Sequence, residues 1–161
     1  MQFVQSEAAT AEHSHPDTQS ARRLGDLEAM APLLAGARAR GIADAFELLG
    51  IAAILIDASG TVLHVGEAAT KLLGSDIAIV SRHVIGATQA TNRALQHLVA
   101  SAISGEDEVT AKPVVMARAG RPPLMVRALP IPGAERDPMQ LLKAVLLLAE
   151  TSADAVAKAA A

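Results

Sequence analysis

The histidines are the residues of this chain most able to do chemistry near neutral pH, since their unperturbed pKa lies there. There are five of them: His13, His15, His64, His83 and His97. His13 and His15 could together pick up a metal ion, but no third ligand lies near them in the sequence, and a stable site needs more. His97 follows Leu95 by two positions, which turns it roughly 200° along a helix, away from the apolar stripe. We therefore expect His97 to be solvated and predict no metal site.

Carboxylates and serines give no catalytic pattern. Three acidic residues at 106–108 follow Gly105, as in a solvated loop after a helix stop. Asp57 precedes Ser59 and Gly60, the composition of a turn. The chain has no G-x-S-x-G, no G-x-x-x-x-G-K-[ST] and no G-x-G-x-x-G following a strand. We predict that the protein is not an enzyme and has no catalytic residues.

Arg118, Arg121 and Arg127 lie close together in the last third of the chain. They could bind an anionic ligand or the carboxylate of a partner protein. Arginines on a half-exposed sheet are usually solvated, because the guanidinium stays charged and carries five donors. We favour that simpler interpretation.

The composition limits the classes of partner. The 161 residues carry a net charge of −3 with a pI near 5.9, whereas nucleic-acid binding requires a basic surface. Aromatic residues make up 1% of the chain, so little surface is available for stacking on flavins or bases. The chain has no cysteine, no signal-peptide pattern and no apolar run long enough to span a membrane. We expect a cytoplasmic protein with no direct contact to nucleic acid or membrane.

The organisation begins with a polar stretch, residues 1–16, which we expect to be a disordered tail. Residues 17–49 carry apolar side chains at spacings of three and four and predict a helical segment, interrupted near Pro32 and Gly41. The apolar stripe is wide, so the segment packs either on its own domain or against a second copy. Residues 151–161 are typical of a short C-terminal helical stub.

Residues 50–150 read as one α+β domain. A hairpin is predicted over 52–65, with its turn at 57–60, followed by a helix over 67–73. A short strand over 76–80 and an irregular stretch over 81–88 lead to a helix over 88–104, capped by Thr88. Three strands follow, at 113–118, 123–131 and 142–150, the last unbroken and apolar enough for a central strand. Strands that do not alternate regularly with helices favour an antiparallel sheet.

The segments AAILIDASGTVLHV, EAATKLLG and GRPPLMVRALPIPGA leading into AVLLLAE occur in this order. Together they resemble the PAS-like sensor region of bacterial LuxR-type transcriptional regulators, over about residues 45–150. The chain has Gly66 where many PAS domains have Asn. The resemblance implies a five-stranded antiparallel sheet with helices on one face, preceded by an N-terminal helix through which the protein forms a homodimer.

The same resemblance implies a function in bacterial regulation. We expect a non-catalytic sensory or signal-transduction module that binds a regulatory protein or a small ligand and holds no cofactor. The family's helix-turn-helix output is absent, so the chain is either a stand-alone module or the sensor fragment of a DNA-binding regulator. One alternative is a haem-binding PAS sensor, in which His97 would be the iron ligand. The other is a roadblock-like interaction protein, which would have a single helix between its second and third strands.

Overall fold

The computed structural model describes residues 37, 39–105, 112–131, 141–152 and 154. All of them belong to one compact unit, Pro32–Ala161. The predicted tail over 1–16, the acidic residues 106–108 and residues 153 and 155–161 of the predicted stub lie outside the described residues. Of the predicted helical segment over 17–49, the structure describes residue 37 and residues 39–49.

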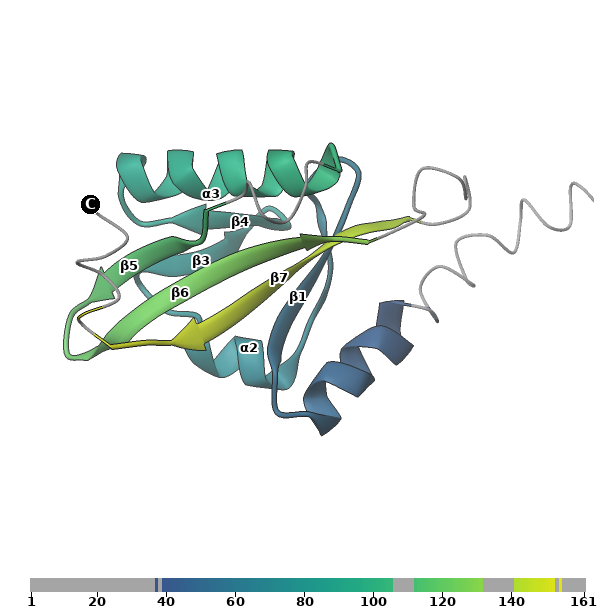
Figure 1. Cartoon of the computed structure of the whole chain (residues 1–161), viewed down its shortest axis with the longest axis horizontal. Coiled ribbons are helices and arrows are strands. Elements are labelled where there is room, and N and C mark those ends of the chain that lie inside the picture. Colours follow the sequence, from purple (N-terminus) through teal and green to yellow (C-terminus); the bar gives the residue numbers. More distant parts are fainter. Residues whose placement is uncertain (1–36, 38, 106–111, 132–140, 153, 155–161) are drawn as a thin grey trace, which may run out of the picture. The chain divides into compact units, whose positions relative to one another are not determined.

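The described core is α+β and contains a five-stranded antiparallel sheet (Figure 1). The strand order is β2-β1-β7-β6-β5, so the last strand lies in the centre, as its unbroken apolar sequence predicts. The hairpin β1–β2 and the final strand β7 were both predicted within one or two residues. The strands are β1 (Ala52–Asp57), β2 (Val62–Val65), β5 (Val114–Arg118), β6 (Arg121–Pro130) and β7 (Leu142–Glu150).

A second, two-stranded sheet pairs β3 (Ile77–Val80) with β4 (His83–Gly86). The prediction of an irregular stretch over 81–88 was wrong for residues 83–86, which form β4. The two-residue turn Ser81–Arg82 has positive φ at both positions, 50° and 63°, as a tight hairpin turn of this kind requires. Such turns are usually recognised by Asn or Gly, and this one has neither, so the sequence carried no hairpin signal.

Three helices are described. Helix α2 (Glu67–Leu72) follows β2, and α3 (Gln89–Ile103) follows β4. The Thr88 hydroxyl accepts a hydrogen bond from the Thr91 amide at 3.1 Å, which confirms the predicted cap of α3. The third helix, residues 39–48, precedes β1 and is the blue helix of Figure 1; we call it the 39–48 helix.

The 39–48 helix ends in a hydrogen-bonded motif built around a glycine. The Ile51 amide bonds the Phe46 carbonyl at 2.8 Å, and the Gly50 amide bonds the Glu47 carbonyl at 2.9 Å. Gly50 has a φ of 68°, a conformation that glycine adopts without a steric penalty. This end turns the chain directly into β1.

The sheet is covered on both faces. Helices α2 and α3 and the β3–β4 hairpin pack with Ile54, Leu95, Leu146 and their neighbours to form the larger core. The 39–48 helix packs on the opposite face, where Ala39 and Ala43 are buried with Leu55 and Val145. The predicted placement of helices on one face is therefore right for α2 and α3, while the 39–48 helix covers part of the other face, on its own domain.

Candidate functional site

The charged residue most deeply buried among those described is Arg118, at the end of β5. Its side chain is 1% exposed, and each part of the guanidinium has an acceptor. Nε donates to the Pro122 carbonyl at 2.7 Å, one terminal nitrogen to the Leu72 carbonyl at 3.3 Å, and the other to the Glu150 carboxylate at 2.5 Å. A buried guanidinium with this set of partners stabilises a specific arrangement of the elements that supply them.

Those partners come from three parts of the chain. Leu72 ends α2, Pro122 lies at the start of β6, and Glu150 ends β7. The nearby Arg121 adds a hydrogen bond from its guanidinium to the Lys71 carbonyl at 3.0 Å and lies 3.9 Å from the Glu150 carboxylate. The last two carbonyls of α2 therefore both accept from arginine, an electrostatically favourable contact at a helix C-terminus.

The other end of α2 is bound by a residue from the opposite face of the sheet. The Glu47 carboxylate, at the end of the 39–48 helix, accepts a hydrogen bond from the Ala68 amide at 3.1 Å. The N-cap residue of α2, Gly66, makes no side-chain cap of its own. A carboxylate at this position satisfies a free amide and interacts favourably with the helix dipole.

Gly66 leaves space for that carboxylate. A Cβ built on Gly66 would lie 2.5 Å from Glu47 Oε1 and 3.2 Å from the Ala53 carbonyl oxygen. A larger residue would displace the glutamate from the helix end. Gly66 departs from the PAS pattern, in which many domains have Asn. Here Glu47 caps α2 instead, by accepting from the amide of Ala68, 21 residues further along the chain.

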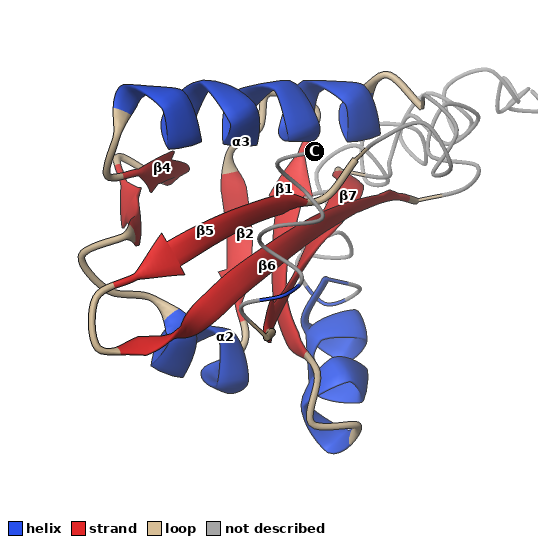
Figure 2. Cartoon of the chain, turned by 60° about the vertical axis from the view of Figure 1, so that its left-hand side comes forward, coloured by secondary structure: helices blue, strands red, loops and turns tan. Residues whose placement is uncertain are grey.

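These contacts form one cluster around α2, which we call the α2 clamp: Glu47 at the N-terminal end, and Arg118, Arg121 and Glu150 at the C-terminal end. Figure 2 shows α2 and the 39–48 helix at the same end of the sheet. Sequence reasoning identified the two arginines but assigned them to solvent. It missed Glu47 and Glu150, because the contacts join residues 21 and 32 positions apart.

Asp57 occupies the β1–β2 turn, as predicted. Its Oδ1 accepts hydrogen bonds from the Ser59 amide at 2.8 Å, the Ser59 hydroxyl at 2.7 Å and the Thr61 amide at 2.9 Å. Partial burial acts to raise the pKa of Asp57, but these hydrogen bonds and the positive charge of Arg82 outweigh it and lower the pKa below its ordinary value. The carboxylate thus stays ionised and organises the turn.

Arg82 holds the neighbouring Ser81–Arg82 turn against β2. Its carbonyl accepts from the Val62 amide at 2.7 Å, and its guanidinium donates to the Val62 carbonyl at 3.2 Å. This two-way bond compensates the unfavourable positive φ of two non-glycine residues. The β3–β4 hairpin is thereby joined to the edge of the main sheet.

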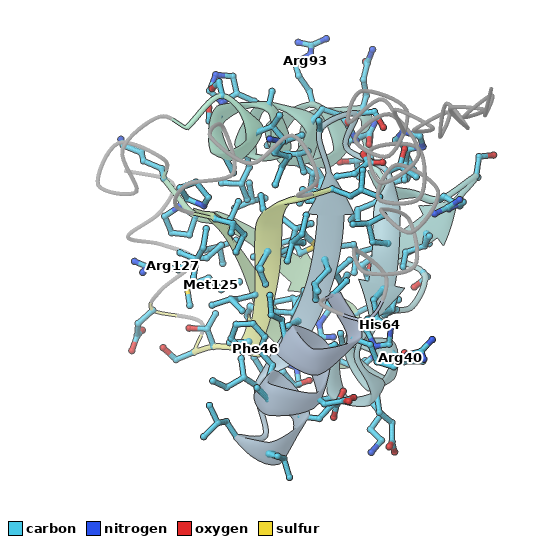
Figure 3. The ribbon with its side chains drawn as sticks, turned by 90° about the vertical axis from the view of Figure 1, so that its right-hand side faces the viewer. Arg40, Phe46, His64, Arg93, Met125 and Arg127 are labelled. Atoms are coloured by element: carbon cyan, nitrogen blue, oxygen red, sulfur yellow. The ribbon has the colours of Figure 1, made fainter. Side chains whose placement is uncertain are left out.

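The remaining residues singled out in the sequence lie apart from the clamp. His97 is exposed on α3, so its role as a haem ligand gains no support from its position and stays a prediction. His64 is half-buried on β2, and the His83 ring lies 2.9 Å from the Ser81 carbonyl. Arg127 is exposed on β6, and Figure 3 shows it with Met125 beside β7. His13 and His15 lie outside the described residues.

Among the described residues, no group of three or more His, Asp or Glu side chains is placed to hold a metal ion. No helix in that part of the chain combines the length and apolarity needed to cross a membrane.

Comparison of the chain with protein families, with characterised proteins and with solved structures finds no significant match.

Proposed function

We propose that the protein is a non-catalytic, PAS-like sensory or signal-transduction module of bacterial regulation. It acts as a homodimer and binds a regulatory protein or a small ligand. The order of its elements supports this role, since a hairpin, two separate helices and three strands follow one another as in the family it resembles. A roadblock-like protein would have one helix between its second and third strands, whereas here the β3–β4 hairpin separates α2 from α3.

The observation that carries the dimer is the exposure of two adjacent leucines at the end of the 39–48 helix. Leu48 is 89% exposed and Leu49 is 72% exposed. Large apolar side chains next to each other in water favour a protein interface, because covering them removes apolar surface from solvent. They lie on the helix that the family resemblance assigns to dimerisation.

The polar residues of the described core support a binding role without catalysis. The Asp57 carboxylate is engaged in its turn, and the Arg118 guanidinium is engaged by Pro122, Leu72 and Glu150. Both groups stabilise the fold. We therefore propose that a signal changes the contacts between the elements of the chain, or between the chain and its partner.

Sedimentation of the purified full chain tests the proposal. We expect a dimer at a concentration on the order of tens of micromolar, within reach of a transient interface. Leu48→Glu should shift it toward monomer, because a charge would enter the interface. Ala90→Glu, the same introduction of a charge on the exposed surface of α3, is the matched control and should leave the dimer intact. A monomeric wild type would reject the dimer, and an equal response of both variants would reject the placement of its interface at Leu48.

A further inference from the structure

The α2 clamp joins the two elements that lead toward the ends of the chain. Glu47 belongs to the helix that precedes the sheet, and Glu150 is the last residue of its final strand. Helix α2 lies between them. At its N-terminal end the Ala68 amide donates to Glu47, and at its C-terminal end the Leu72 and Lys71 carbonyls accept from Arg118 and Arg121, the arginines beside Glu150. We propose that α2 is a relay, which couples the position of the 39–48 helix to the order of the chain at the end of β7.

The short length of α2 makes its order dependent on the clamp. Six residues form fewer than two turns, and a helix of that length has little stability of its own in water. Its stability comes from the burial of Ala69, from the packing of Ala68 and Leu72 on the larger core, and from capping at both ends. Loss of the Glu47 carboxylate leaves the Ala68 amide without its acceptor, so the first turn loosens and the helix frays.

Fraying of α2 acts directly on Arg118. The Leu72 carbonyl is one of three acceptors of a guanidinium that is almost fully buried. If that carbonyl moves, a buried N–H loses its partner, which is costly unless the guanidinium shifts. Arg118 also bonds Glu150 and the Pro122 carbonyl, while the Thr151 amide bonds the adjacent Pro123 carbonyl at 2.8 Å. A shift of Arg118 therefore loosens the end of β7 and its link to β6.

The relay deepens the proposed function, since it rests on that signalling role for its use: a partner or second copy that moves the 39–48 helix would change the order of the end of β7 and of Thr151. The direction of coupling is reciprocal, as equilibrium coupling between two sites must be. The relay itself is a property of a single chain. If sedimentation shows a monomer, the proposed dimer is rejected and the relay is unaffected. The exchange experiment below can reject the relay while the dimer stands.

Amide hydrogen exchange measured by NMR on the full chain tests the relay. In Glu47→Ala we expect the Thr151 amide to exchange faster by about two- to thirtyfold, the range that couplings through packed networks usually span. The Arg118 Nε resonance should shift as well. Asp44→Ala removes another carboxylate from the exposed surface of the same helix and is the matched control, with no change at Thr151.

Two reporters make the outcome decisive. The Ile51 amide, bonded to Phe46, reports whether the 39–48 helix survives, and the Leu146 amide, in the central strand β7, reports global opening. If the helix is lost in Glu47→Ala, Glu150→Gln measures the coupling in reverse, through faster exchange at Ala68. The relay is rejected if faster exchange stops at the first turn of α2, if Leu146 accelerates as much as Thr151, or if Glu150→Gln leaves Ala68 unchanged.

Discussion

The two faces of the sheet are built differently. On one face, α3 places large side chains such as Leu95 and Leu98 into the core, and α2 and the β3–β4 hairpin complete the cover. On the other face, the 39–48 helix contacts the sheet through two alanines, Ala39 and Ala43, with Ile42 and Phe46 packed beside them. Figure 3 looks onto this second face, with Phe46 over the strands.

The difference concerns how firmly each cover is held. Small side chains let a helix approach the sheet closely, but they bury little apolar area per residue, and hydrophobic stabilisation scales with that area. The 39–48 helix is therefore the more easily displaced cover. Its position is reinforced by the Glu47 contact to α2, which belongs to the other face. The Glu47 carboxylate thus connects the 39–48 helix to the layer on the other face.

The largest expected effect on stability comes from substituting two neighbouring residues of β1. Ile54 faces the larger core and Leu55 faces the 39–48 helix, and both are fully buried. Truncation of a buried aliphatic residue costs about 2–5 kcal/mol, with the smaller values where the surroundings can collapse into the gap. We expect Ile54→Ala to lie near the top of that range and Leu55→Ala near the bottom in urea denaturation. Equal costs would contradict the idea that the 39–48 helix yields more easily.

A smaller effect is expected on the helix itself. Phe46→Ala should lower the free energy of unfolding by about 2 kcal/mol, less than for a fully buried aromatic, because Phe46 is only partly buried. Exchange protection should fall at Ile51 and remain in α3. Phe46→Leu is the control and should keep most of the packing. Loss of α3 protection to the same extent would show that the two faces unfold together.

The cap of α3 tests whether the two faces respond independently to a substitution. Thr88→Ala removes the local cap of α3 and should cost about 1 kcal/mol, with faster exchange in the first turn of that helix. Because the cap is local, the amide of Ile51 on the other face should not respond. Thr88→Ser retains the hydroxyl and serves as the control, measured by thermal denaturation and exchange. A response at Ile51 would mean that α3 and the 39–48 helix are coupled directly.

The smallest effect concerns pH and the β1–β2 turn. The pKa of Asp57 is lowered in the folded state, from an ordinary value of 3.8. A lowered pKa means that the ionised carboxylate stabilises the fold above the unfolded pKa, and that this contribution is lost as the pH falls through the folded pKa. Asp57→Asn should therefore be less stable than wild type at pH 7, and the difference should shrink below pH 3.8. A difference that stays constant across this range would contradict the assignment.

Much of the described fold could be predicted from the sequence because its signals are local. Asp57 and Gly60 mark a turn by their own hydrogen bonding and conformational freedom, and Thr88 and Gly105 mark the two ends of α3. The unbroken apolar sequence of β7 indicated a strand buried on both faces, and it contributes to both cores. In each case a residue and its near neighbours contain the physical cause.

The hairpin β3–β4 shows where local signals fail. Ser81 and Arg82 are poor residues for a turn with positive φ, and what holds them is Val62 of another strand. Arg118 shows the same limit for the candidate site. Its type predicts a solvated cation, since burial of a charge is unfavourable unless partners are supplied.

The sequence by itself determined the α+β class of the described core, the antiparallel strands and the ends of its longest helix, because apolar periodicity, caps and turn residues act over a few positions. The tertiary structure alone decided that Arg118 is buried against Glu150, that Glu47 caps α2 and that residues 39–48 cover the second face. These contacts join residues far apart in the chain. Their partners become neighbours only after the sheet has formed, and no local pattern encodes which distant carboxylate will meet which amide or guanidinium.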